Sequence, residues 1–157
     1  MGDAGDNPGV RFPPPLLYAL AVIGGYLLNR RWPLPLPVGD GVLIKTLAWA
    51  LTFASLALAV TSIGNFRRSR TSIVPVRPAT ALVIAGPYRF TRNPIYIGFV
   101  IFYFGLAIML TSAWILVLLI PVLIVLQRGV VEREEAYLQA KFGEAYRKYQ
   151  ARVPRWL

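Results

Sequence analysis

Apolar residues gather in four runs that polar or proline-rich stretches separate. The first covers residues 16 to about 28, and the second covers about 42 to 64. The third (95–110) and the fourth (113 to about 126) are divided only by Thr111 and Ser112. A helix needs ~20 apolar residues to cross a bilayer. The pattern therefore predicts an all-α fold, an integral membrane helical bundle with about four transmembrane helices.

The spacing of these runs predicts how two of the helices begin or end. The third and fourth runs are too long together for one span, so we expect a tight helical hairpin at Thr111 and Ser112. The first run is short, and its helix either thins the bilayer or begins within the prolines before Leu16. Gly98 and Gly105 fall on nearly one face of the third run, which would allow a neighbour or ligand to approach closely.

After the four apolar runs, apolar residues recur with the period of one helix face. This spacing predicts an amphipathic C-terminal helix from Val130 to about Ala151. Its polar side carries charged residues such as Arg133 and Glu144. Its apolar stripe contains five residues: Val131, Leu138, Phe142, Ala145 and Tyr149.

Glu135 projects into this apolar stripe, and Glu134 lies at its edge. A buried carboxylate is costly without a positive partner. The partner is either a structural arginine (Arg89, Arg92 or Arg128) or a cationic ligand. The sequence leaves both possibilities open.

Charge sets the expected topology. The net charge is +10, and of the 17 Lys and Arg residues only Arg30, Arg31 and Lys45 lie outside the loop 65–93 and the two tails. The positive-inside rule then places this loop and both termini in the cytoplasm. We expect a multi-pass protein of the prokaryotic cytoplasmic (inner) membrane. Because the basic residues flank apolar runs, we expect contact with the bilayer surface and no nucleic acid partner.

Composition narrows the chemistry. Hydrophobic residues make up 56% of the 157 residues, which favours a membrane protein over a soluble domain. The sequence has no His and no Cys, which excludes thiolate chemistry, disulfides, a zinc site of the usual kind and a His base. We predict no metal and one domain over residues 1–157, with residues 1–11 disordered and no removable signal peptide.

Segment 86–98, with the sequence GPYRFTRNPIYIG, contains the strongest candidate site. Pro94 keeps Asn93 out of helical angles and suits the first turn of a new helix. The free N–H groups of that turn, beside Arg89 and Arg92, would bind a carboxylate or phosphate. The alternative is a cluster of arginines that only flanks a membrane helix. Together with Glu134 and Glu135, the segment would offer both poles of a zwitterionic ligand site.

Segment 86–98, the span ending YFGLAIML and the tail EREEAYLQAKFGEAYRKYQARVPRWL resemble a known superfamily over residues 65–157. It is the isoprenylcysteine carboxyl methyltransferase and phospholipid (phosphatidylethanolamine) methyltransferase superfamily of integral-membrane enzymes. The carboxyl methyltransferases usually have His at the position of Asn93, and Asn at this position is similar to the phospholipid enzymes. The C-terminal tail, by contrast, is more similar to the carboxyl methyltransferases. The acceptor implied is an isoprenylcysteine carboxylate or a phospholipid amine.

The resemblance implies S-adenosylmethionine as cofactor and residues 65–157 as the cofactor-binding core. It maps the cofactor-binding motifs onto segment 86–98 and onto the pair Glu134 and Glu135. We expect Glu135 and Arg128 to be catalytic. The expected cofactor-binding residues are Tyr88, Arg89, Arg92, Asn93, Pro94, Tyr96, Gly98, Glu134 and Glu135.

Methyl transfer suits this composition because it depends on positioning and desolvation more than on acid–base groups. The acceptor is expected to be an amphiphile that enters sideways from the bilayer. A carboxylate acceptor needs no base, whereas an ammonium acceptor must first lose a proton to Glu134, Glu135, a Tyr or water. Two alternatives remain: an NADPH-dependent membrane reductase of related architecture, and a non-enzymatic lipid-binding membrane protein.

Overall fold

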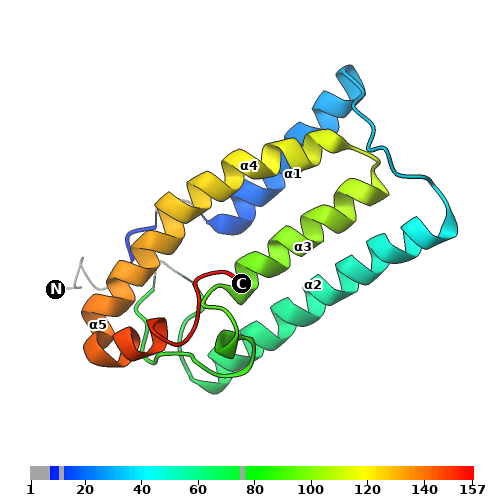
Figure 1. Ribbon diagram of the computed structural model, residues 1–157. Coiled ribbons are helices and arrows are strands. Elements are labelled where there is room, and N and C mark those ends of the chain that lie inside the picture. Colours follow the sequence, from blue (N-terminus) through cyan, green and yellow to red (C-terminus); the bar gives the residue numbers. More distant parts are fainter. Residues whose placement is uncertain (1–7, 11–12, 75–76) are drawn as a thin grey trace. The chain divides into compact units, whose positions relative to one another are not determined.

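The computed structural model describes residues 8–10, 13–74 and 77–157, and these contain helices and no strand (Figure 1). Most of residues 1–11, where we predicted disorder, lies outside the described part. The α-helices are α1 (Pro14–Arg31), α2 (Val42–Arg68), α3 (Pro94–Met109), α4 (Ala113–Leu126) and α5 (Glu132–Gln150). A 3₁₀ turn, η1 (Gly86–Arg89), precedes α3, and a π-helical segment, η2 (Gln127–Val131), joins α4 to α5.

The chain forms two compact units, each built from separate stretches of sequence. We call Phe12–Ala57 with Tyr96–Val125 the bundle unit. We call Met1–Arg11, Leu58–Ile95 and Leu126–Leu157 the loop unit. Each is described by itself.

The bundle unit packs helices closely where glycine leaves room. A Cβ on Gly25 of α1 would lie 3.0 Å from the Ile115 Cα of α4. A Cβ on Gly105 of α3 would lie 3.0 Å from the Ala48 carbonyl oxygen of α2. The close approach predicted at Gly105 is therefore confirmed, while the approach at Gly25 was not foreseen. Such contacts bring helix backbones together, as in membrane bundles.

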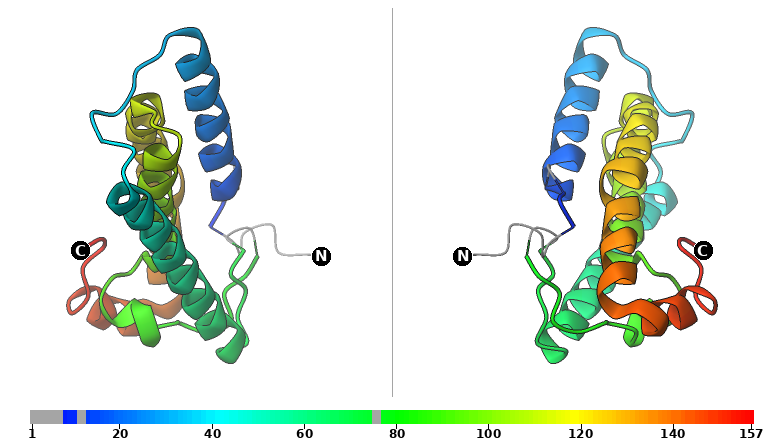
Figure 2. Two further views of the ribbon diagram at one scale, coloured as in Figure 1. Left: turned by 90° about the vertical axis from the view of Figure 1, so that its right-hand side faces the viewer. Right: turned by 90° about the vertical axis from the view of Figure 1, so that its left-hand side faces the viewer.

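A buried tyrosine pair also joins α1 to α3 within the bundle unit. The Tyr103 hydroxyl donates a hydrogen bond to the Tyr18 carbonyl. The Tyr18 ring stacks on Phe99 with ring centroids 4.7 Å apart. Figure 2 shows the helices of this unit running alongside one another.

The tight hairpin predicted at Thr111 and Ser112 is present between α3 and α4. Thr111 has a φ of 46°, in the left-handed region. The Ser112 N–H donates to the Ala107 carbonyl at 3.0 Å, and the Thr111 N–H donates to the Ile108 carbonyl at 3.1 Å. This pair of bonds is the Schellman motif, in which the left-handed position is usually glycine.

The connection between α1 and α2 packs on this turn. The Ala113 N–H donates to the Leu34 carbonyl at 2.8 Å, and the Trp114 indole N–H donates to the Trp32 carbonyl at 2.7 Å. In Figure 1 both connections lie at the same end of the bundle unit. These bonds satisfy backbone groups that the helix ends leave free.

The bounds of α1 and α2 differ most from the predicted ones, and α1 also ends later than predicted, at Arg31. The α1 helix begins at Pro14, within the prolines, as one of the two alternatives anticipated. Proline is tolerated there because its missing N–H has no partner in a first turn. The α2 helix continues past the predicted Gly64 to Arg68. It ends in a second Schellman motif with Arg70 at a φ of 50°.

Two helical stretches of the described residues are long and apolar enough to cross a membrane. They are α2 and the continuous run Ala113–Gln150, while α3 is apolar but shorter. Many large apolar side chains of the bundle unit are exposed, including Phe53 (62%) and Ile120 (61%). The number of spans and the sidedness of the termini remain predictions.

In the loop unit, α5 carries a small core. Tyr146, Tyr149 and Val153 are buried together, and Leu82 from the loop before η1 packs against them. The Ala79 N–H donates to the Tyr137 hydroxyl at 3.0 Å, which also ties that loop to α5. The loop therefore folds back on the C-terminal helix.

The apolar stripe predicted on α5 is wrong at Ala145. Ala145 is exposed, and its neighbour Tyr146 is buried. The reason is Gly143, whose φ of 51° and ψ of −120° interrupt the helix. A uniform rotation of ~100° per residue does not hold across such a break, so the buried face changes its phase.

Candidate functional site

The segment that precedes α3 is shaped by Gly86. Its φ of 61° is one that residues with a Cβ rarely adopt, and a Cβ there would also displace the end of the Asn65 side chain, so both observations favour glycine. Pro87 then occupies the first turn of η1. The turn buries Tyr88, whose ring meets Phe66 edge-on at 5.5 Å, and leaves Arg89 exposed.

Residues 91–93 are held by the C-terminal tail through three hydrogen bonds. The Arg92 N–H donates to the Pro154 carbonyl at 3.0 Å. The Arg155 carbonyl accepts from the Thr91 hydroxyl at 3.0 Å and from the Asn93 amide nitrogen at 2.9 Å. Thr91 and Asn93 are buried, so these bonds satisfy polar groups that water does not reach.

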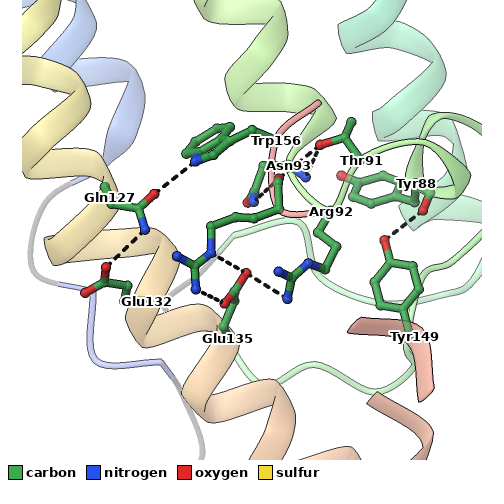
Figure 3. A network of polar contacts seen from close by, with 10 residues as sticks. Tyr88, Thr91, Arg92, Asn93, Gln127, Glu132, Glu135, Tyr149 and Trp156 are labelled. Carbon is green, nitrogen blue, oxygen red and sulfur yellow. Dashed lines mark hydrogen bonds and ion pairs between the residues drawn. The ribbon is translucent and has the colours of Figure 1, made fainter. Parts of the chain in front are cut away.

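Glu135 lies between two guanidinium groups (Figure 3). Arg92 Nη1 lies 3.1 Å from Glu135 Oε1. Arg155 makes a two-pronged contact, Nε to Oε1 at 3.0 Å and Nη2 to Oε2 at 2.7 Å. The Glu135 and Arg92 side chains are 10% and 12% exposed, and Arg155 is 37% exposed. The burial predicted for Glu135 is confirmed, and of the three arginines considered, Arg92 is the one that pairs with it.

Arg92 keeps unused hydrogen-bonding capacity. Its Nε and Nη1 are buried without a hydrogen-bond partner among the described residues, although Nη1 lies within ion-pair distance of Glu135. Buried donors of this kind are rare and costly. They could bind an anionic group.

Three tyrosines near this cluster keep their protons. Burial is the main cause that raises the pKa of Tyr88 and of Tyr149. Burial, followed by the Glu135 charge, raises the pKa of Tyr146 to about 12. At neutral pH these side chains are therefore hydroxyl donors and not phenolates. The hydrogen bond to Glu135 raises the pKa of Arg155, which keeps its charge.

One side of the cluster continues into the π-helical segment η2. The Trp156 indole N–H donates to Gln127 Oε1 at 3.1 Å, and the Gln127 amide nitrogen donates to Glu132 Oε1 at 3.0 Å. The tail thus contacts η2 as well as residues 91–93. Extra turns of π-helix are frequent at functional sites.

The other predicted site residues differ in their burial. Arg89 and Arg128 are exposed, and Glu134 is half-buried and close enough to raise the pKa of Tyr88. Pro94 is fully buried at the start of α3. Tyr96 and Gly98 are buried in the following turn and belong to the bundle unit.

Five residues of this network were not predicted from the sequence: Thr91, Gln127, Glu132, Arg155 and Trp156. Arg155 and Trp156 belong to the tail motif that carries the resemblance, so the tail motif could have drawn attention to them. Thr91 and Gln127 carry no such signal, because neutral hydroxyl and amide groups occur throughout loops and helix ends.

Comparison with known proteins gives two relatives and one family. A stretch of 45 residues is 42% identical to an uncharacterized protein of Haemophilus influenzae, covering 29% of this chain and 68% of that protein. A stretch of 102 residues is 35% identical to protein-S-isoprenylcysteine O-methyltransferase B of Arabidopsis thaliana. This second match covers 62% of the chain and half of the plant protein's length.

The family match covers well over half of the chain. Residues 43–145 match the phospholipid methyltransferase family. The matched region contains residues 91–93 and Glu135, which the structure brings together. The chain belongs to the phospholipid methyltransferase family.

Proposed function

We propose that this protein is a membrane methyltransferase that uses S-adenosylmethionine and acts on a lipid-like or prenylated amphiphile. The observation that carries the proposal is the ion pair between Glu135 and Arg92, the neighbour of Asn93, within the region that matches the family. Glu135 lies far from Arg92 and Asn93 in the sequence.

The residues present fit the cofactor. The Arg92 Nε is a buried donor without a protein partner among the described residues, which suits the carboxylate of the methionyl group. Glu135, with Glu134 nearby in sequence, suits its ammonium and sulfonium charges, and aromatic side chains such as Tyr88 favour cations. S-adenosylmethionine, when bound, supplies an activated methyl group on a positively charged sulfur.

The protein's part in the reaction is positioning and exclusion of water. Burial of Glu135 and Arg92 supplies a site of low dielectric, where charge pairs orient a ligand strongly. An ammonium acceptor must give up its proton, and Glu134 and Glu135 are the candidates to take it. Tyr146 is a poor candidate because its pKa is raised to about 12.

The acceptor is proposed to reach the site from the bilayer. Two helical stretches are long and apolar enough to span it, and the bundle unit exposes large apolar side chains that lipid would cover. The basic residues of loop 65–93 and the tail would face the anionic cytoplasmic surface of a prokaryotic inner membrane. Both an isoprenylcysteine carboxylate and a phospholipid amine meet these requirements.

A methyl-transfer assay tests the proposal. The purified protein in lipid nanodiscs is incubated with methyl-labelled S-adenosylmethionine and either phosphatidylethanolamine vesicles or a farnesylated cysteine. Label in one organic-soluble product is expected, and its chemistry identifies the acceptor. Calorimetry with Arg92→Ala is expected to show cofactor binding weaker by ~1.5–3 kcal/mol.

The matched control is Arg89→Ala, which changes an exposed arginine of the same segment. Arg89→Ala is expected to lose less affinity for S-adenosylmethionine than Arg92→Ala loses. If the wild-type protein does not bind S-adenosylmethionine, the methyltransferase proposal fails, and a reductase or a lipid-binding protein becomes the better interpretation.

A further inference from the structure

The C-terminal tail contributes to the Glu135 cluster in two separate ways. Its backbone carbonyls at Pro154 and Arg155 accept hydrogen bonds from residues 91–93. The Arg155 side chain makes the two-pronged contact with Glu135 described above. The backbone of the tail is therefore anchored independently of the guanidinium group.

The two arginines that hold Glu135 differ in their access to water. The Arg92 side chain is 12% exposed, so breaking its pair with Glu135 would leave a buried charge without a partner, which is costly. Arg155 is 37% exposed, and its guanidinium can return to water at a smaller cost. Of the two partners, Arg155 is the one that another cation can replace.

The Arg155 contact also uses both carboxylate oxygens of Glu135. Nε lies 3.0 Å from Oε1 and Nη2 lies 2.7 Å from Oε2, while Oε1 also faces Arg92. Besides Arg92, a further positive group therefore cannot contact both carboxylate oxygens from this edge while Arg155 stays in place.

We propose that Arg155 competes with the positively charged part of the cofactor for Glu135, and that ligand binding displaces its guanidinium while the tail backbone stays bonded to residues 91–93. This inference rests on the proposed function. It assigns to Arg155 a negative contribution to cofactor affinity. A residue that only positions Glu135 would contribute in the opposite direction.

The test is the dissociation constant of S-adenosylmethionine, measured by calorimetry on the full chain in detergent. Arg155→Ala is expected to bind it roughly 5- to 30-fold more tightly than the wild type, the factor that corresponds to an interaction of 1–2 kcal/mol. Arg155→Lys, which keeps the charge but loses the fork, is expected to bind more tightly by a smaller factor.

Arg152→Ala is the matched control, because Arg152 lies in the same tail, is exposed, and donates to the Lys148 carbonyl. Its affinity is expected to equal that of the wild type. If Arg155→Ala does not fold, the competition model is tested by whether Arg155→Lys binds S-adenosylmethionine more tightly or more weakly than the wild type.

Unchanged or weaker binding by a folded Arg155 variant overturns the competition model while leaving the proposed function intact. Tighter binding supports it. If neither the wild type nor any variant binds S-adenosylmethionine, the proposed function is overturned and this inference falls with it.

Discussion

The Tyr149 hydroxyl donates a hydrogen bond of 2.7 Å to the backbone carbonyl of Tyr88. The bond joins α5 to η1, two elements that are remote in sequence, and both tyrosines are buried. It fixes the turn that leads into residues 91–93. The geometry of the candidate site therefore depends on a contact outside the charged cluster.

Tyr149→Phe should lower the free energy of unfolding by about 1–3 kcal/mol, because it removes the donor to a buried carbonyl. Denaturant or thermal unfolding in detergent measures the change. Tyr26→Phe is the control, since Tyr26 is 44% exposed. Equal losses in the two variants would mean that the Tyr149 bond contributes nothing specific.

Glu135→Gln should destabilise the protein by about 3 kcal/mol without any ligand. The substitution leaves the buried Arg92 guanidinium without a counter-charge. The resulting loss of stability exceeds the few tenths of a kcal/mol that an exposed ion pair contributes. Glu144→Gln is the matched control, because its pair with Arg147 is 3.0 Å long but well exposed. An unchanged melting temperature for Glu135→Gln would show that the pairing is not structural.

Thr111→Gly should raise the free energy of unfolding by up to about 1 kcal/mol. Thr111 holds a φ of 46° at the end of α3, a conformation that disfavours a β-branched side chain. Glycine removes that strain, although its greater freedom in the unfolded chain offsets part of the gain. Thr111→Ala keeps a Cβ and should gain less, so similar stability of the two variants would contradict this account.

Stability should fall between about pH 10 and pH 12. The pKa of Tyr146 rises from ~10 in the unfolded chain to about 12 in the folded one, so its contribution is complete below pH 10. It is lost as the pH rises toward the folded value, because the unfolded chain ionises first. Tyr146→Phe should make this decline shallower in melting curves recorded at several pH values, and an unaltered slope would exclude the effect.

Topology can be checked with reporter fusions at Asp40 and after Leu157. The distribution of Lys and Arg predicts four spans with both termini in the cytoplasm, so the two fusions should report opposite sides. Reports from the same side would rule out the four-span arrangement.

The sequence predicted the helices best in the third and fourth apolar runs, which are free of charged residues. The observed α3 and α4 lie within one residue of their predicted bounds, because a continuous apolar run leaves few alternatives. The end of α2 was missed by four residues. The helix ends where the Schellman motif at Arg70 stops it, and this point lies beyond the end of the apolar run.

The candidate site was only half predictable. Burial of Glu135 followed from its place on a helix face, and Arg92 was among the partners considered. Arg155 was not foreseen, because the path of the tail is set by the packing of Val153 on Tyr146 and Tyr149. That path is a tertiary property, which no local pattern encodes.

The order in which the chain is synthesised bears on how the site forms. Asn93 and Arg155, which share a hydrogen bond, are 62 residues apart. At ~5–20 residues per second, the ribosome adds that stretch in roughly 3–12 s. During this interval Thr91 and Asn93 lack the carbonyl that later satisfies them, and Arg92 lacks Glu135 for most of it. The nascent protein therefore has a period in which its bundle helices are complete while its charged cluster is not.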